Sequence, residues 1–231
     1  MTIQPNPEAH SALTLYSYWR SSAAFRVRIG LNLKRLTYRQ VPIHLLRDGG
    51  EQHSPDYRSI NPQAQVPVLY HGRRRLRQSL AILEYLDEVW QEPRLLPTNA
   101  RSRQRVRAIA LMIACDVHPL GNLRVLQYLD HELRLAQIER DRWVRHWIVA
   151  GLDAVEQLLA DDVSTGAFCD GEAPTIADCC LVPQLYSARR FGMDLARYPT
   201  LRRIEATCLA LPSFVAACPE HQPDAPQAST T

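Results

Sequence analysis

A chain of 231 residues, 46% of them hydrophobic and 22% charged, can bury the core of one large or two smaller domains and does not have the composition of a disordered protein. Its formal net charge of +3 is too small to indicate a nucleic-acid-binding protein. The polar residues 2–10 do not resemble a signal peptide, and no run approaches the roughly 20 apolar residues that span a membrane.

The number and spacing of the cysteines indicate the redox state of the compartment. All six lie in the second half of the chain, without CxxC or metal-ligand spacing, and two of them are adjacent in an apolar run: Cys115, Cys169, Cys179, Cys180, Cys208 and Cys218. This pattern predicts buried thiols, no bound metal, and a reducing compartment, which we take to be the cytoplasm.

Residues 13–33 predict a strand that runs into a helix. Leu13, Leu15 and Ser17 alternate as in a short strand, and after Arg20-Ser21-Ser22 the apolar residues Phe25, Ile29 and Leu33 recur at four-residue spacing. Serine is a preferred N-cap, and a helix N-terminus with hydroxyl groups suits an anion such as a thiolate. Whether the serines bind an anion or only cap the helix stays open on this stretch alone.

The rest of the first 90 residues predicts a β-α-β-loop-β-β-α order. Residues 38–43 form a second alternating run whose Pro42 favours the edge of a sheet, and residues 46–57 form a loop that can hold a turn of helix. A third strand begins near Val66-Pro67, a hairpin at His71-Gly72 leads to an arginine-rich return strand, and Gln78-Ser79 opens a helix. We interpret those arginines as a solvated hairpin tip.

The second half is predicted to be helical. Residues 91–99 are interpreted as a linker, residues 100–222 show helical periodicity, and Thr175 to Asp178 has the spacing of a capping box that starts the most apolar helix. Residues 223–231 have the composition of a disordered tail. The expected fold class is therefore α/β plus all-α, with a thioredoxin-like domain over 12–90 and a helical domain over 100–222.

Three segments of the first domain suggest one ligand. In a thioredoxin-like sheet the proline that opens the third strand is often cis, so Val66 can pair its N–H and C=O with an extended peptide. Gln78-Ser79 at a helix N-terminus suits a carboxylate, and Ser21-Ser22 suits a sulfur. The tripeptide glutathione meets all three demands.

Several motifs resemble those of the zeta-class glutathione transferases. In the first domain they are Arg20-Ser21-Ser22, Arg26-Val27-Arg28-Ile29, Asp48-Gly49-Gly50, Asn61-Pro62, Gln65-Val66-Pro67 and Gln78-Ser79-Leu80-Ala81-Ile82. In the second they are Asp116 to Leu126, Asp178 to Gln184, and Phe191 through Tyr198-Pro199. The resemblance covers about residues 13–222, and the motifs occur in the same order as in that class.

The resemblance implies a set of site residues. Glutathione would be bound by Ser21, Ser22, Gln52, Val66, Pro67, Gln78, Ser79, His118, Asn122 and Arg124. Ser21 would activate the thiol with support from Ser22, and the substrate carboxylates would be held by Arg20, Arg124 and Arg190, with Arg189 as an alternative to Arg190. One position departs from the class: Ala23 stands where many members have cysteine. His118 stands where some members have glutamine, and either residue can hydrogen-bond the tripeptide. A homodimer is also implied.

The implied reaction is the glutathione-dependent cis–trans isomerisation of maleylacetoacetate, a dicarboxylate of tyrosine and phenylalanine breakdown. Maleylpyruvate presents the same cis-enedioate, so a maleylpyruvate isomerase is a close alternative. A transferase acting on small α-halo acids and a non-enzymatic dimeric scaffold are two further alternatives. A disulfide reductase is disfavoured because no cysteine lies near the first helix.

Overall fold

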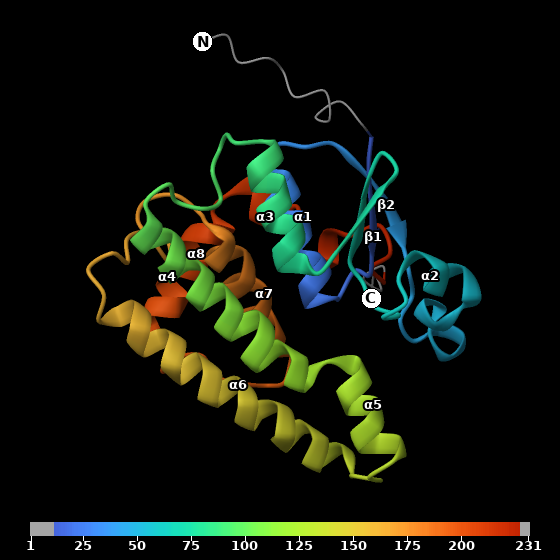
Figure 1. The fold of residues 1–231 in the computed structure, drawn as a ribbon. Helices are drawn as coiled ribbons and strands as arrows, with labels where there is room; N and C mark the ends of the chain where they lie inside the picture. The colour runs from blue at the N-terminus through green and yellow to red at the C-terminus, as the bar shows by residue number, and fades with distance from the viewer. Residues whose placement is uncertain (1–11, 227–231) are drawn as a thin grey trace, which may run out of the picture. The chain divides into compact units, whose positions relative to one another are not determined.

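The computed structural model describes residues 12–226 of the chain (Figure 1). These residues divide into two compact units. The first unit holds the residues up to Leu95 together with those from Leu211 onward, and the second unit holds Leu96–Ala210. Residues 1–11, and residues 227–231 of the expected disordered tail, lie outside the described residues.

The first unit contains a mixed four-stranded sheet. Its elements are β1 Leu13–Ser17, α1 Ser22–Leu33, β2 Tyr38–Pro42, two 3-10 turns at Arg47–Gly49 and Glu51–His53, α2 Pro55–Ile60, β3 Val68–His71, β4 Arg74–Arg77 and α3 Ser79–Val89. The strand order is β2-β1-β3-β4; β1 pairs with β2 in parallel, and the other two pairs are antiparallel. The predicted element order and the edge position of the strand that contains Pro42 are confirmed.

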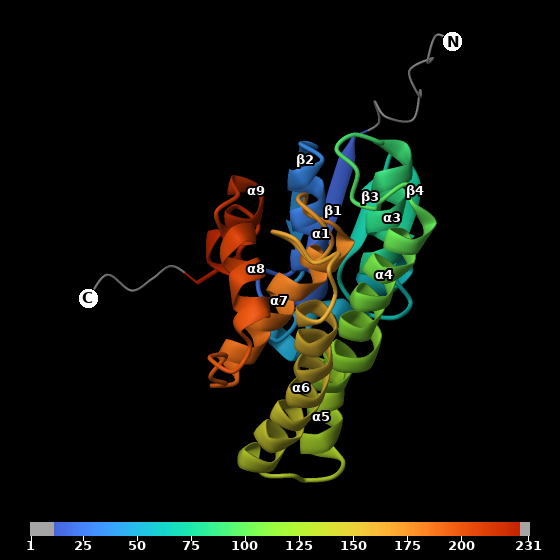
Figure 2. The same cartoon turned by 90° about the vertical axis from the view of Figure 1, so that its left-hand side faces the viewer.

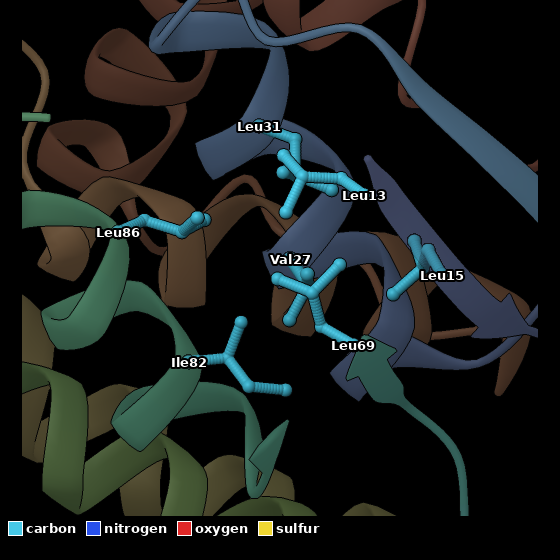
Figure 3. Close-up of a cluster of buried hydrophobic side chains, with 7 residues drawn as sticks. All are labelled: Leu13, Leu15, Val27, Leu31, Leu69, Ile82 and Leu86. Carbon is cyan, nitrogen blue, oxygen red and sulfur yellow. The ribbon is translucent and has the colours of Figure 1, made fainter. Parts of the chain in front are cut away.

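The sheet is covered on both faces because its strands alternate. One face packs α1 and α3 against β1 and β3 through a cluster of buried aliphatic side chains: Leu13, Leu15, Val27, Leu31, Leu69, Ile82 and Leu86 (Figure 3). The other face buries Val68 with Tyr57 of α2. Burying each such aliphatic side chain contributes about 1.5–3 kcal/mol, so the hydrophobic alternation fixes which residues point toward which helix.

Helix α1 is buried on nearly every side, including its cations. Arg26, Arg28 and Lys34 are at most 5% exposed. Lys34, the single lysine of the chain, places Nζ 2.6 Å from Asp87 Oδ1 and donates to the carbonyls of Trp90 and Pro93. The first residues of the expected linker are therefore tied to the first unit, which extends this unit to Leu95 rather than to residue 90.

The C-terminal segment is not part of the helical unit, to which the sequence-based boundaries assigned residues up to 222. Residues 211–226, with α9 at Pro212–Val215 and a 3-10 turn at Pro219–His221, belong to the first unit, and α9 contacts α1 (Figure 2). Asn32 Nδ2 donates to the Ser213 carbonyl at 3.0 Å, and Arg28 Nε donates to the Ala217 carbonyl at 3.0 Å. Residues 223–226, expected to be disordered, are placed here as well. Composition cannot reveal these contacts because their partners are nearly 200 residues away.

The second unit is helical, as predicted. It contains α4 Ala100–Leu111, a π-helical turn Met112–Val117, a 3-10 turn His118–Gly121, α5 Leu123–His131, α6 Gln137–Ala160, α7 Ile176–Arg190 and α8 Pro199–Leu209. Helix α7 is the buried centre and contacts both α4 and α8 (Figures 1 and 2). It begins with the predicted capping box, in which Asp178 Oδ2 accepts the Thr175 N–H at 2.7 Å. Its cysteines Cys179 and Cys180 are buried.

The stretch Ala100–His131 differs from the expectation that no run in the chain is long and apolar enough to span a membrane. By length and composition alone it is apolar enough to cross a membrane. It is, however, not one regular helix: a π-helical turn and a 3-10 turn that contains Pro119 interrupt it. Part of its surface packs on α6 and α7. We therefore interpret it as part of the helical unit.

Candidate active site

The turn between β1 and α1 presents the paired serines. The Ser21 N–H donates to the Tyr18 carbonyl at 3.0 Å, which closes the turn, and Ser21 is the N-cap of α1. Its Oγ accepts the Ala24 N–H at 3.2 Å, while the hydroxyl proton stays available for another acceptor. Ser22 is the first residue of the helix, and both serines are partly exposed. The arrangement can bind an anion, since free N–H groups and the helix dipole favour negative charge there.

The strand register brings the other predicted segments of the first unit to the same end of the sheet. Tyr16 near the end of β1 pairs with Val68 at the start of β3, and Val68 pairs with Arg77 at the end of β4. The residues after β1, before β3 and after β4 are therefore neighbours. The loop that leads to Gln52 also starts there, because Ser17 pairs with Pro42 of the parallel strand β2.

Val66 offers a backbone edge at this end. The Val66–Pro67 peptide bond is cis. Among the described residues, no hydrogen bond involves the backbone N–H or C=O of Val66. The preceding carbonyl, of Gln65, is held by two donors, Tyr57 Oη at 2.7 Å and Asn61 Nδ2 at 2.8 Å. Burial raises the pKa of Tyr57, so its hydroxyl stays protonated and can donate this bond.

The N-terminus of α3 supplies a second helix end. Gln78 is its N-cap, with φ at +68°, and makes no side-chain cap of its own, so the first N–H groups of the helix stay available. Gln78 is exposed and donates from Nε2 to Gln63 Oε1 at 2.9 Å. Ser79 is buried, and its Oγ accepts a hydrogen bond from Arg26 at 3.3 Å. A carboxylate at this end would meet free N–H groups, with the Arg26 guanidinium behind Ser79.

Gln52 is buried with an acceptor unused. It is 4% exposed and lies in the 3-10 turn Glu51–His53. Its Nε2 donates to the Leu45 carbonyl at 3.2 Å, whereas Oε1 has no hydrogen-bond partner within residues 12–226. Gly50, at φ +103°, makes room for it, because a Cβ there would lie 2.4 Å from Nε2. An unsatisfied buried amide oxygen suits a ligand that donates a hydrogen bond.

In the helical unit, three of the predicted residues share one short segment. His118 opens the 3-10 turn, Asn122 is the N-cap of α5 and accepts the Arg124 N–H at 3.3 Å, and Arg124 is exposed. Helix α6 supports this segment. Trp143 Nε1 donates to the Leu120 carbonyl at 2.7 Å.

The structure separates the two neighbouring arginines at the end of α7. Arg189 forms a double hydrogen bond with the buried carboxylate of Glu205, which raises the pKa of Arg189. Arg190 is exposed and stacks over the Phe191 ring, with 4.8 Å between the guanidinium carbon and the ring centroid. Because Glu205 already engages Arg189 within the fold, Arg189 is disfavoured as a ligand of an external carboxylate. Within the described residues, no three His, Cys, Asp or Glu side chains are grouped so that they could hold a metal ion.

Comparison with protein-family models assigns both parts of the chain to known domain families. Residues 11–88 match the glutathione S-transferase N-terminal domain, and residues 136–206 match the glutathione S-transferase C-terminal domain. The chain belongs to the glutathione S-transferase family. Its fold is the two-domain glutathione S-transferase fold, and the resemblance to the zeta class is confirmed by the relatives described next.

Three similar proteins are informative. A probable maleylacetoacetate isomerase of Vibrio cholerae is 51% identical over 93% of this chain and 99% of its own length. The holo structure of a maleyl pyruvate isomerase, described as a bacterial glutathione S-transferase in the zeta class, has a TM-score of 0.90 at 44% identity and covers 92% of this chain and 100% of that chain. A maleylacetoacetate isomerase from Anaeromyxobacter dehalogenans 2CP-1 with bound GSH has a TM-score of 0.83 at 48% identity, covering 93% and 98%. Another structure of that protein holds dicarboxyethyl glutathione and citrate, with a TM-score of 0.81 at 46% identity, covering 94% and 99%.

Two groups that support the first turn of this glutathione S-transferase are not among the predicted site residues. Arg28 is fully buried and donates to the Tyr18 and Trp19 carbonyls. A cation in a helix that is apolar on all sides is a usable signal, because a buried charge needs partners. Asp224, whose Oδ2 accepts the Trp19 N–H at 2.8 Å, gave no local signal.

Proposed function

We propose that this chain is a glutathione-dependent cis–trans isomerase that converts maleylacetoacetate to fumarylacetoacetate in tyrosine and phenylalanine breakdown. The observation that carries the proposal is the single end of the sheet where the N-termini of α1 and α3 and the backbone of Val66 meet. Relatives named maleylacetoacetate isomerase support the choice of substrate.

Glutathione lies, in this proposal, in an extended form along Val66. The backbone N–H and C=O of Val66 pair with the cysteinyl residue of the tripeptide, next to Pro67. The N–H groups of α3, with Gln78 and Ser79, hold the γ-glutamyl carboxylate. Gln52 accepts a hydrogen bond through its free Oε1. From the helical unit, His118, Asn122 and Arg124 complete the contacts.

The reaction needs a thiolate and a place for the charge that it creates. Ser21 donates its hydroxyl proton to the sulfur, and with the dipole of α1 this favours the thiolate; Ser22 supports it. The thiolate adds to an alkene carbon, the π electrons move into an enolate, and the former double bond rotates as a single bond. The enolate then expels the sulfur and leaves the trans alkene, so glutathione is regenerated. Arg20, Arg124 and Arg190 hold the carboxylates and the enolate.

Two further observations fit this chemistry. Dicarboxyethyl glutathione is bound in the active site of a structure of the Anaeromyxobacter protein, and thiolate addition to a cis-enedioate would give an adduct of this type. Ala23 follows the paired serines, and no cysteine precedes Cys115 in the chain, so the nucleophile proposed here is the sulfur of glutathione and not a protein thiol.

The second candidate is a maleylpyruvate isomerase, which the similar structure of that name favours. The deciding measurement is kcat/KM for both substrates, with glutathione, without it, and with S-methylglutathione. We expect the larger value for maleylacetoacetate, no turnover without glutathione, and inhibition by S-methylglutathione, which fits the site but cannot add. A larger value for maleylpyruvate reverses the order of the two candidates. Failure to bind immobilised glutathione would favour the scaffold alternative, and halide release from small α-halo acids alone would favour the transferase.

We further infer a homodimer in a reducing, cytoplasmic setting. The buried free cysteines of the helical unit support the reducing compartment, since they form no bridge in this structure. Light scattering of the purified protein measures the oligomeric state. A monomer at micromolar concentration would contradict the first inference.

A further inference from the structure

The turn that carries Arg20 and Ser21 is held from outside by the C-terminal end of the chain. Asp224 Oδ2 accepts the Trp19 N–H at 2.8 Å, across 205 positions of sequence. Its other oxygen, Oδ1, accepts a longer hydrogen bond of 3.4 Å from Gln40 Nε2 on the edge strand β2. A hydrogen bond to an ionised acceptor is about twice as strong as one between neutral groups, so Asp224 is a firm support for the turn.

Arg28 joins the same two segments from the inside. Its guanidinium donates to the Trp19 carbonyl at 3.0 Å, the Tyr18 carbonyl at 3.4 Å and Ser17 Oγ at 3.1 Å. Its Nε donates to the Ala217 carbonyl at 3.0 Å. The Tyr18 carbonyl also accepts the Ser21 N–H that closes the turn. One fully buried side chain therefore links the turn to residue 217.

The C-terminal segment is itself rigidly built. Gln222 is buried, and its Nε2 donates to the carbonyls of Ala216 at 3.0 Å and Cys218 at 2.7 Å. Asn32 anchors the start of the segment on α1 through the Ser213 carbonyl. Because the segment is fixed at Ser213, Ala217 and Gln222, the carboxylate of Asp224 has little freedom to leave Trp19.

We propose that residues 211–226 form a C-terminal brace for the active site and that Asp224 is a positioning residue, which acts on the reaction by fixing the Trp19–Ser21 turn. This proposal rests on the proposed function, because it assumes that Ser21 meets the sulfur of glutathione. Arg20 is affected too: its guanidinium stacks on the Trp19 ring at 5.3 Å, so the same turn places a candidate carboxylate clamp.

The test compares D224A with D224N. The alanine removes both acceptor oxygens, whereas the asparagine keeps one oxygen for the Trp19 N–H and loses only the charge. The matched control is D194A, which removes an exposed carboxylate that accepts a backbone N–H at 2.9 Å in the helical unit. The readouts are kcat, KM for glutathione, the ultraviolet absorbance of bound thiolate, and amide hydrogen exchange of residues 17–22 in the protein without ligand.

For D224A we expect kcat to fall about tenfold, because the Trp19 N–H loses its charged acceptor and the turn is held less firmly. We also expect a smaller thiolate signal and faster exchange at residues 17–22. D224N should lie between the wild-type protein and D224A, because its neutral oxygen accepts a weaker hydrogen bond from the Trp19 N–H, and D194A should match the wild-type protein. If D224N lost as much activity as D224A, the acceptor beside the Trp19 N–H would not be what positions the turn, and that result overturns the proposal.

The exchange measurement separates this proposal from the proposed function. If the wild-type protein neither binds glutathione nor turns over substrate, the proposed function fails, whatever the brace does. If the wild-type protein is active and D224A exchanges and reacts as the wild type does, only the brace fails. Faster exchange with unchanged kcat and thiolate signal also overturns it, since the brace would then be purely structural.

Discussion

Replacing Ser21 by alanine removes two functions of one hydroxyl group. In the structure Ser21 Oγ accepts the Ala24 N–H at 3.2 Å as the N-cap of α1. In the proposed reaction the same hydroxyl donates its proton to the sulfur of glutathione. Ser21→Ala should therefore lower both stability and activity, and the two losses have different sizes.

The loss of the cap should lower the free energy of unfolding by about 1 kcal/mol. For a chain of this size that corresponds to a fall in Tm of roughly 2–4 °C. Removal of a donor to the thiolate should cost about 1.5–3 kcal/mol in the transition state, or roughly 10- to 150-fold in kcat/KM. The predicted effect on catalysis is thus much larger than the cap alone can explain.

Ser21→Asp separates the two functions. Aspartate is as good an N-cap as serine, so the Tm should stay near that of the wild type. Its carboxylate cannot donate a proton when ionised and repels a thiolate, so activity should fall at least as far as in Ser21→Ala. Ser22→Ala, at the first helical position, is the matched control and should lose less activity than Ser21→Ala.

The assay is glutathione-dependent isomerisation at saturating glutathione, with thermal unfolding of each variant followed by circular dichroism. A Ser21→Ala protein with at least half of the wild-type kcat/KM would refute the assignment of Ser21. A larger loss in Ser22→Ala than in Ser21→Ala would transfer the role to Ser22. If Ser21→Ala is inactive and its Tm falls far more than predicted, the activity of Ser21→Asp decides the assignment, because that variant keeps the N-cap.

Three further predictions follow from the helical unit. Arg189→Leu leaves the carboxylate of Glu205, 5% exposed at its side chain, without its partner and should destabilise the protein by roughly 1–3 kcal/mol. Arg190→Leu should lower kcat/KM while it destabilises the protein less than Arg189→Leu does. Equal activity losses in both variants would contradict this division. In a thiol titration of the native protein, exposed Cys115 should react first and buried Cys179 only on unfolding. A rapid reaction of all thiols would show that the core of the helical unit is accessible to the reagent. Burial raises the pKa of Cys179 above its unfolded value, so the stability that this thiol contributes is present below about pH 8.5 and is lost as the pH rises. The urea midpoint of unfolding should therefore fall between pH 8 and pH 10, and it should fall less in Cys179→Ala.

The sequence alone was sufficient wherever a signal is local. Alternation at Leu13 and Leu15, serines before a four-residue apolar repeat, and a proline in an edge strand follow directly from backbone geometry and hydrogen-bonding capacity. The capping box at Thr175 is local for the same reason. The order of the motifs then sufficed for the family.

Only the tertiary structure determined what supports those residues. The register of three strands brings the segments at Ser21, Val66 and Gln78 to one end of the sheet, and no local pattern encodes that register. The tertiary structure also pairs Arg189 with Glu205. It places Asp224, which lies in a segment with the composition of a disordered tail, against Trp19. Such contacts join residues far apart in the chain and depend on how the whole core packs, so a single sequence carries no local record of them.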